Sequence, residues 1–276
     1  RHAFATHVRR PTSRTANVLL ALCGVGRKTR IVGGSLSNIA EYPWMVGMVK
    51  QGLFHCGGSL ITRNHVLTAA HCLDGYERKH FELHMGDQDI TKRSSSLYRR
   101  RIKSWTIHES FNPYNLNNDI AIVELDRSVP LDGVVRTACL PENRAIDYTG
   151  ALAMAVGWGR IKEGSEVSKL LRNVRLPVLS EEECDESGYP KTRRTENMFC
   201  AGYLEGRFDS CSGDSGGPLL VQGPLGITSF GRGCARPRYP GVYTKLTNYL
   251  GWLEDKLGDD CVSSAPCNSV AIIASG

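Results

Sequence analysis

The sequence of 276 residues is long enough for one or two domains, and its 41% hydrophobic and 22% charged residues are typical of a soluble globular protein. The net charge of +6 does not call for a nucleic-acid partner, and the apolar runs at 18–22 and 270–274 are shorter than the roughly 20 residues of a membrane span. The ten cysteines, none in a Cys-x-x-Cys pair, favour disulfides over metal ligation. We therefore expect a secreted, extracellular protein without a metal or cofactor.

The N-terminal segment at 1–30 is basic and has few apolar residues beyond one short run, which predicts a mostly extended pro-segment. It begins at Arg1 without a visible secretory signal, so we expect a processed or truncated product. The segment ends in the sequence RKTR, directly before IVGG at 31–34. A cut after Arg30 would free the α-amine of Ile31, a group with a pKa near 8.

Short apolar or β-branched runs bounded by glycine, proline and asparagine recur from residue 43 onward and favour strands over helices. Many short strands with frequent turns predict an all-β fold of antiparallel barrels or a sandwich, two forms that the apolar pattern does not separate. The expected strands lie at 43–49, 58–61, 65–69, 119–125, 151–158, 176–179, 218–221, 226–230 and 241–243.

The last part of the main domain has a different pattern. Between residues 243 and 257 the apolar residues recur at helical spacing, which predicts an amphipathic helix. Gly258 is expected to end this helix. The predicted divisions are a pro-segment at 1–30, a main domain at 31–258 and a loose tail at 259–276.

Three motifs carry candidate catalytic side chains. Ser215 lies in the glycine-rich motif GDSGGP, and a serine hydroxyl is a weak nucleophile unless a base stands beside it. His71 in TAAHC offers that base, and Asp119 in NDIAIV offers a carboxylate to orient it. The backbone N–H groups of Gly213 and Ser215 can point at one developing oxyanion. For the first motif taken alone, a tight turn with an incidental serine is the alternative.

With histidine, aspartate and serine in this order, the chain resembles the trypsin/chymotrypsin family of serine proteases from Ile31 to about Leu257. The resemblance implies two six-stranded antiparallel β-barrels with the active site in the cleft between them. We expect the amphipathic C-terminal α-helix to pack on the second barrel. It also implies that Ser215 is the nucleophile, that His71 is the general base and then the acid, and that Asp119 orients the imidazole.

In this family a zymogen is cut directly before IVGG, here after Arg30. The resemblance implies that the freed ammonium of Ile31 inserts beside Asp214 as a buried ion pair and orders the turn that holds Gly213 and Ser215. Breaking such a pair costs about 3–5 kcal/mol. The activator must accept arginine, so it is either a second trypsin-like protease or this protein itself.

Substrate choice is expected to depend on Asp209, six residues before Ser215, because the resemblance places it at the floor of the primary specificity pocket. A carboxylate there pairs with arginine through a fork and with lysine through a point charge, so we expect protein substrates to be cleaved after Arg or Lys. Phe230 stands where trypsins usually carry tryptophan, which leaves the preferences at neighbouring substrate positions open. The expected substrate-binding residues are Asp209, Ser210, Ser229, Phe230, Gly231 and Gly241, and Ser229 is also expected to hydrogen-bond Asp119.

The cysteines add a clue to the kind of protease. Disulfides each contribute roughly 2–4 kcal/mol. A bond from the pro-segment to the main domain would keep the two parts attached after activation, as in many proteases of clotting and immune cascades. We therefore expect a regulatory protease, with a digestive trypsin as the alternative. The pairs implied by the resemblance are Cys23–Cys139, Cys56–Cys72, Cys184–Cys200 and Cys211–Cys234, which leaves Cys261–Cys267 by elimination.

A catalytically silent homologue that acts as a binding module is the alternative from another class, although such homologues usually lose a triad residue. The expected partners are an activating trypsin-like protease and serpin-type or other protein inhibitors. The basic runs at 98–103 and 191–194 are interpreted as solvated loops or self-cleavage sites, or else as a site for an acidic protein or a sulfated polysaccharide. The loop at 87–97 corresponds to the calcium loop of pancreatic trypsins, but Leu97 replaces an acidic ligand, so no calcium site is expected.

Overall fold

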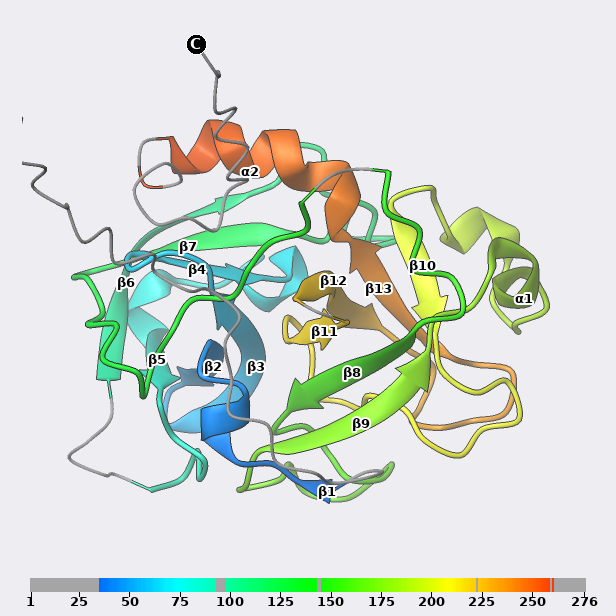
Figure 1. Ribbon diagram of the computed structural model, residues 1–276, viewed down its shortest axis with the longest axis horizontal. Helices are drawn as coiled ribbons and strands as arrows, with labels where there is room; N and C mark the ends of the chain where they lie inside the picture. Colours follow the sequence, from blue (N-terminus) through cyan, green and yellow to red (C-terminus); the bar gives the residue numbers. More distant parts are fainter. Residues whose placement is uncertain (1–34, 93–97, 143–144, 222, 259, 261–276) are drawn as a thin grey trace, which may run out of the picture.

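The computed structural model describes residues 35–92, 98–142, 145–221, 223–258 and 260. Two β-structures lie side by side, one from the first half of this chain and the other mainly from the second half (Figure 1). The predicted pro-segment, the junction after Arg30 and nearly all of the tail lie outside the described residues. None of the helices in the described part is long and apolar enough to span a bilayer.

The first barrel is closed by hydrogen bonds between six antiparallel strands in the order β2-β3-β4-β7-β6-β5. Successive side chains of a strand point to opposite faces, and the inward ones fill the barrel. Met48, Leu60, Leu83 and Val123 are completely buried there. The strands are β2 (Met45–Lys50), β3 (Leu53–Leu60), β4 (His65–Thr68), β5 (Phe81–Met85), β6 (Tyr98–Ile107) and β7 (Ala121–Leu125).

The second barrel has six antiparallel strands in the order β9-β8-β11-β12-β13-β10, with the short strand β1 added beside β9. An isolated antiparallel bridge between Val178, just after β9, and Ala201 of β10 joins the two ends of this row. The expectation of two six-stranded antiparallel barrels is therefore confirmed. The strands are β1 (Ser35–Leu36), β8 (Leu152–Gly157), β9 (Arg172–Pro177), β10 (Met198–Ala201), β11 (Pro218–Leu220), β12 (Pro224–Phe230) and β13 (Gly241–Lys245).

The basic run at 98–103 is a strand, β6, and not the solvated loop expected from its charges. Arg100 is only 8% exposed, and its guanidinium donates to three backbone carbonyls, at 2.8, 3.0 and 3.1 Å. On the outer face Lys103 pairs with Glu124 at 2.7 Å and Arg99 lies 3.5 Å from Glu82. The acidic partners interrupt the basic face, so these contacts do not favour the predicted polysaccharide site.

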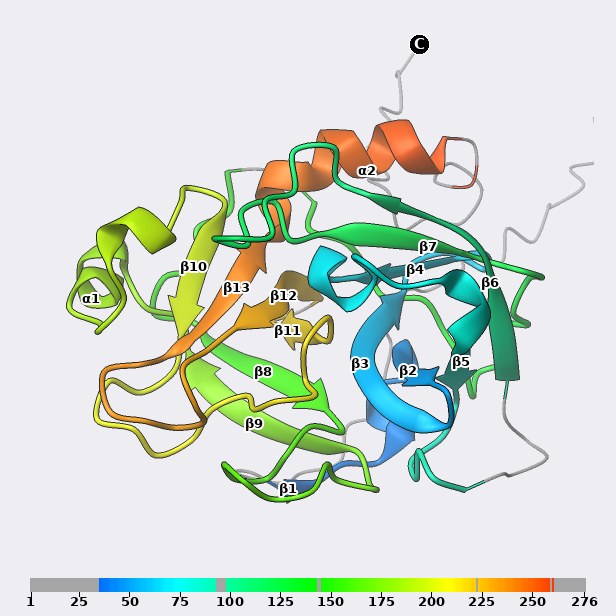
Figure 2. The same ribbon diagram turned by 180° about the vertical axis from the view of Figure 1, so that it is seen from behind.

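The C-terminal helix begins later than expected and packs on the other barrel. Residue 243 is still part of β13, and a 3-10 turn, η5 (Leu246–Tyr249), precedes the α-helix α2 (Leu250–Leu257). Leu253 and Leu257 join the apolar core of the first barrel, and Figure 2 shows α2 beside β7, so the expected packing on the second barrel is wrong. Gly258 ends the helix as predicted, with φ +51 and its N–H donating to the Glu254 carbonyl at 3.0 Å.

The remaining helices are short. They are α1 (Glu181–Asp185) and the 3-10 turns η1 (Ile39–Glu41), η2 (Ala70–Cys72), η3 (Arg78–His80) and η4 (Lys191–Arg193). Turn η2 connects β4 to the loop before β5, and η4 lies in the loop between α1 and β10. Both turns carry side chains that matter for the site described below.

Three of the expected disulfides are present in the described residues: Cys56–Cys72, Cys184–Cys200 and Cys211–Cys234. Cys139 is also disulfide-bonded. Its expected partner, Cys23, and the expected pair Cys261–Cys267 lie outside the described residues.

Candidate active site

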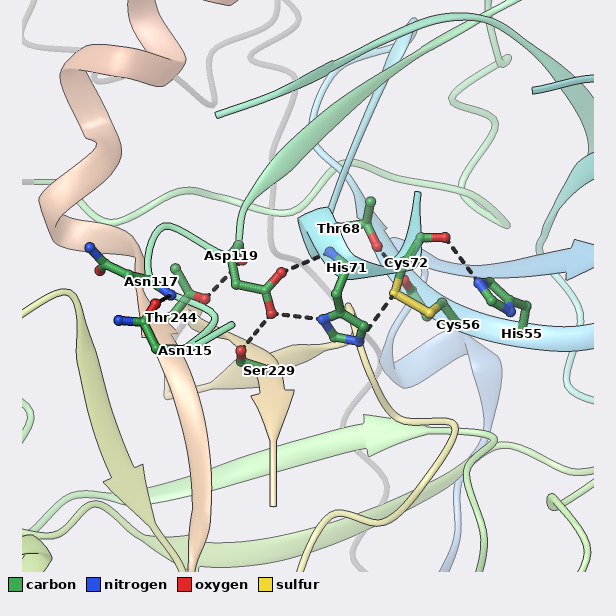
Figure 3. Close-up of polar contacts among 11 residues, drawn as sticks. His55, Cys56, Thr68, His71, Cys72, Asn115, Asn117, Asp119, Ser229 and Thr244 are labelled. Atoms are coloured by element: carbon green, nitrogen blue, oxygen red, sulfur yellow. Dashed lines mark hydrogen bonds and ion pairs between the residues drawn. A yellow bond between two sulfur atoms is a disulfide. The ribbon is translucent and has the colours of Figure 1, made fainter. Parts of the chain in front are cut away.

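Two of the three candidate catalytic side chains meet where the barrels face each other. His71 lies in η2 directly after β4, Asp119 lies two residues before β7, and Ser229 lies on β12 of the second barrel. Nδ1 of His71 is 2.7 Å from Oδ2 of Asp119, and the backbone N–H of His71 donates to Oδ1 at 2.9 Å (Figure 3). Oγ of Ser229 donates to Oδ2 at 2.5 Å, so the contact expected between Ser229 and Asp119 is present.

These contacts fix both the orientation and the tautomer of the imidazole. Asp119 is 0% exposed, and an ionised carboxylate accepts hydrogen bonds but donates none. Nδ1 of His71 must therefore carry the proton, which leaves a lone pair on Nε2. Three hydrogen-bond donors offset part of the cost of burying the Asp119 charge. The arrangement lets His71 accept a proton at Nε2 from a neighbouring hydroxyl.

Asp119 itself is held by groups from both barrels. Asn118 adopts φ +58, a left-handed conformation that asparagine tolerates better than most residues. Its side chain donates to the Ser110 carbonyl and accepts from the Tyr249 hydroxyl, both at 2.8 Å. Thr244 Oγ1 of β13 donates to the backbone carbonyl of Asp119 at 2.9 Å. A shift of either barrel would therefore move the carboxylate.

The turn that carries His71 is fastened to β3 by the Cys56–Cys72 disulfide. Nε2 of His55 bonds the carbonyl of Cys72 at 2.9 Å, which gives this histidine a structural role. Nε2 of His71 lies 3.9 Å from Sγ of Cys72. The close grouping of His71 with the two sulfurs is not a metal site, because both sulfurs are consumed in the disulfide and offer no thiolate.

The turn around Ser215 depends on two glycines. Gly213 has φ +101 and Gly216 has φ +78, values that glycine adopts without strain, and a Cβ on Gly216 would lie 2.2 Å from a threonine oxygen of β4. The Ser215 carbonyl accepts the N–H of Gly57 at 2.8 Å, which ties the turn to the first barrel. Within the described residues the N–H groups of Gly213 and Ser215 donate to no other group. Two such donors suit a developing oxyanion.

The structure brings Ser215 to the same region as His71 but does not join them directly. Among the described contacts there is none between Oγ of Ser215 and the imidazole, whereas the Asp119–His71 contact is complete. Catalytic hydrogen bonds of a nucleophile are often long without substrate and tighten when it binds.

Asp214 faces a cavity of about 320 Å³ that Gly157, Gly159 and Asp209 also line. Its Oδ1 accepts the N–H of Gly159 at 2.8 Å, and its Oδ2 accepts the N–H of Cys211 at 2.9 Å. Burial raises the pKa of Asp214 to about 6, although both N–H groups act in the opposite direction. No cationic side chain of the described segments pairs with it. The cavity therefore offers a carboxylate to an incoming cation.

Asp209 borders the same cavity and has an unpaired oxygen. Its Oδ2 accepts the N–H of Ala235 at 3.3 Å, whereas its buried Oδ1 has no hydrogen-bond partner in the described part of the chain. Burial raises the pKa of Asp209 to about 7, against the opposing effect of backbone N–H groups. A Cβ on Gly241 would lie 3.0 Å from Oδ1, so a glycine there leaves room beside the carboxylate. A buried, unpaired carboxylate oxygen is stabilised by a cationic ligand.

Among the other expected substrate-binding residues, Ser210 follows Asp209 directly in the chain. Oγ of Ser210 hydrogen-bonds the hydroxyl of Tyr243 at 2.8 Å, and Tyr243 is completely buried. Sequence reasoning missed Tyr243, whose only signal is its place two residues after Gly241. Phe230 is half-buried and Gly231 is exposed, and both continue the chain beyond Ser229. Sequence reasoning also missed Tyr189, whose ring meets that of Phe230, and Tyr239, whose ring meets that of Tyr189; neither has a motif of its own.

Comparisons with known proteins show which family the chain resembles. A family model described as Trypsin matches residues 31–253. "Serine protease filzig" of Drosophila melanogaster is 39% identical over 258 residues, which are 86% of this chain and 15% of that protein. "Clotting factor G beta subunit" of Tachypleus tridentatus is 35% identical over 248 residues, which are 82% of this chain and 79% of that protein. "Transmembrane protease serine 9" of Rattus norvegicus is 36% identical over 265 residues, and this chain spans only 24% of its length.

Proposed function

Because this chain belongs to the trypsin family of serine proteases, we propose that it is a secreted serine endopeptidase, made as a zymogen, that cleaves protein substrates after arginine or lysine. The observation that carries the proposal is the buried contact of Asp119 with His71 and Ser229, which leaves Nε2 of His71 able to accept a proton. The proposed catalytic residues are His71, Asp119 and Ser215.

In the proposed mechanism, Nε2 of His71 takes the proton of Ser215 as Oγ attacks the substrate carbonyl carbon. The resulting oxyanion accepts hydrogen bonds from the N–H groups of Gly213 and Ser215. His71 then gives its proton to the leaving amine, and an acyl-enzyme forms. Water, deprotonated by His71 in the same way, attacks the acyl carbon and regenerates the Ser215 hydroxyl. Asp119 stays ionised and stabilises the imidazolium in both steps.

The specificity proposal rests on the unpaired Oδ1 of Asp209. An arginine side chain of the substrate would reach that oxygen past Gly231 and Gly241, which have no side chain to narrow the entrance. Within the pocket, the substrate guanidinium would supply the partner that the buried Oδ1 of Asp209 lacks.

Zymogen activation and the division into a pro-segment at 1–30, a catalytic domain at 31–258 and a tail at 259–276 belong to the same proposal. The cavity beside Asp214 supports it, because it offers a partner for the ammonium of Ile31. The disulfide at Cys139 is consistent with a tether to Cys23. A role in a regulatory cascade is supported by the name of one relative, a clotting factor subunit, and it implies control by serpin-type or other protein inhibitors.

A serine-directed fluorophosphonate, applied before and after limited trypsin digestion, tests the proposal. We expect strong labelling of Ser215 only after the cut at Arg30, together with cleavage of a peptide library after Arg and Lys. Asp209→Ser is expected to abolish that preference, whereas Glu205→Ser, an exposed carboxylate of the same loop, should not. No labelling of the correctly cut chain would favour a catalytically silent homologue. Indifference to the residues flanking Arg or Lys would favour a digestive trypsin.

The raised pKa of Asp209 predicts how the pocket responds to pH. Because burial raises that pKa to about 7, the carboxylate is mostly protonated at pH 6 and mostly ionised at pH 8. A cationic ligand needs the ionised form, so the affinity for benzamidine should fall about tenfold for each pH unit below 7 and level off above it. Calorimetric titration measures this binding directly, without turnover. Asp209→Asn should remove the pH dependence together with most of the affinity. A Kd that stays constant from pH 5 to 8 would contradict the prediction.

A further inference from the structure

Phe230, Tyr189 and Tyr239 form a row of three aromatic rings on the second barrel. The ring of Tyr189 meets those of Phe230 and Tyr239 edge to face, with centroids 5.7 and 5.3 Å apart. The hydroxyl of Tyr189 accepts the N–H of Arg232 at 3.0 Å and donates to the Pro240 carbonyl at 3.1 Å. Three separate segments thus hold the rings in place, and the row forms a fixed surface.

An arginine lies at each end of this row. The guanidinium carbon of Arg193, in η4, is 5.4 Å from the ring centre of Phe230. That of Arg232 is 4.8 Å from the ring centre of Tyr239, and Arg232 also donates to the Tyr239 hydroxyl at 2.8 Å. Stacking on the rings orders both side chains while their charges stay exposed to solvent. We refer to Arg193 and Arg232 as the cationic rim.

Nearby carboxylates do not neutralise the cationic rim. Asp185 is already paired with Lys191, at 2.6 Å, and with Arg194. Glu163 is paired with Arg236 through two guanidinium nitrogens. Within the part of the chain that the structure describes, no carboxylate lies within ion-pair distance of Arg193 or Arg232. The rim is therefore a positive surface open to a ligand.

The rim lies on the acyl side of the proposed cleavage site. Nε2 of His71 must reach the leaving amine, and it lies 3.9 Å from Sγ of Cys72, so the leaving group departs toward the Cys56–Cys72 disulfide. On the other side, the segment 229–235 is bonded at one end to the triad carboxylate and at the other to the pocket carboxylate. Substrate residues that precede the cleaved Arg or Lys must leave the pocket along this segment, past Phe230 and the rim.

We propose, on the basis of the proposed function, that the cationic rim selects substrates with Asp or Glu at the third and fourth positions, counting back from the cleaved Arg or Lys as the first. The same rim repels the chain's own activation sequence, RKTR, because the basic residues Lys28 and Arg27 occupy those two positions. Efficient activation then requires a second protease whose groove tolerates basic residues there. The rim keeps the zymogen from activating itself.

Two amide substrates test the proposal on the trypsin-cut protein: Glu-Glu-Thr-Arg, and Arg-Lys-Thr-Arg, which copies the activation sequence. The rim attracts the two glutamates of the first substrate and repels the two basic residues of the second, so we expect kcat/KM to be about tenfold higher for the acidic substrate. Arg193→Glu and Arg232→Glu should each reduce the preference, and the double variant should reverse it. Arg101→Glu makes the same charge change on the exposed face of β6 and should leave the preference unchanged.

The conservative variants Arg193→Lys and Arg232→Lys separate charge from packing. They keep the positive charge but lose the planar stacking group, so the acidic preference should persist if charge selects the substrate. A preference lost in the lysine variants as fully as in the glutamate variants would overturn the role of charge.

Self-activation gives the second measurement. The full chain with Ser215→Ala serves as substrate, because it cannot cut itself, and N-terminal sequencing follows the appearance of Ile31. The wild-type cut protein should release it slowly, and the Arg193→Glu, Arg232→Glu double variant about tenfold faster. If both peptides are cleaved after arginine at equal rates, the rim proposal is wrong and the proposed function stands. If neither peptide is cleaved by the verified cut protein, the proposed function is wrong and the rim proposal fails with it.

Discussion

Asp119→Asn is expected to lower kcat of the cut protein about ten-thousand-fold near neutral pH, the loss typical of this substitution in a Ser-His-Asp triad. The carboxylate accepts from Nδ1 of His71 at 2.7 Å and from its backbone N–H at 2.9 Å, so the imidazole proton must lie on Nδ1. An amide in that place also carries a donor, and donation to Nδ1 would move the imidazole proton to Nε2. His71 would then have no lone pair for the Ser215 proton. Steady-state kinetics on an arginine amide, normalised by the amount of folded protein, measure the loss.

Ser229→Ala is the matched control, because it removes a different contact of the same carboxylate. Oγ of Ser229 donates to Oδ2 at 2.5 Å, and its loss leaves the two contacts with His71 intact. A hydrogen bond to a charged group contributes about 1.5–3 kcal/mol, so kcat should fall by no more than about a hundredfold. If Asp119→Asn loses no more activity than Ser229→Ala, the carboxylate does not set the tautomer of His71.

The catalytic motifs are visible in the sequence because each has a strict local requirement. Gly213 and Gly216 have positive φ, and Asn118 has the left-handed conformation that places Asp119, so only a few residue types fit these positions. The strands β2, β4, β8 and β12 were also predictable, since their apolar runs are bounded by turn residues. A local sequence pattern is enough to predict a site where the backbone conformation admits only a few residue types.

The features that could not be predicted from the sequence depend on contacts between segments far apart in the chain. The hydroxyl of Tyr189 hydrogen-bonds the backbone carbonyl of Pro240, which lies 51 residues away in the sequence. No sequence pattern near either residue predicts this hydrogen bond. Arg100 has the composition of a surface residue but is buried because three backbone carbonyls lie within its reach. The helix α2 was predictable as amphipathic, but its apolar face does not say which barrel it covers. These contacts between distant segments follow from the topology of the fold, which a local sequence pattern does not reveal.

Asp214→Asn is expected to lower kcat/KM of the trypsin-cut protein by about a hundredfold or more. In the proposed activation, the ammonium of Ile31 enters the cavity of about 320 Å³ and pairs with this carboxylate. Removing one partner of a buried ion pair costs about 3–5 kcal/mol, which corresponds to about two to four powers of ten in the population of the active state. Kinetics on an arginine amide measure the loss, and N-terminal sequencing verifies that the variant is cut after Arg30 like the wild type.

Asp87→Asn is the control, since Asp87 is also buried, at 7% exposed, with its pKa raised by burial, but lies away from the Ser215 turn. It should retain activity after cutting. Both oxygens of Asp214 already accept backbone N–H groups. Burial still raises the pKa of Asp214 to about 6, so the ionised form remains costly without a cation. If cut Asp214→Asn is as active as the wild type, the turn of Gly213 and Ser215 holds without an ion pair between Ile31 and residue 214. Cleavage after Arg30 would then control something other than the oxyanion donors.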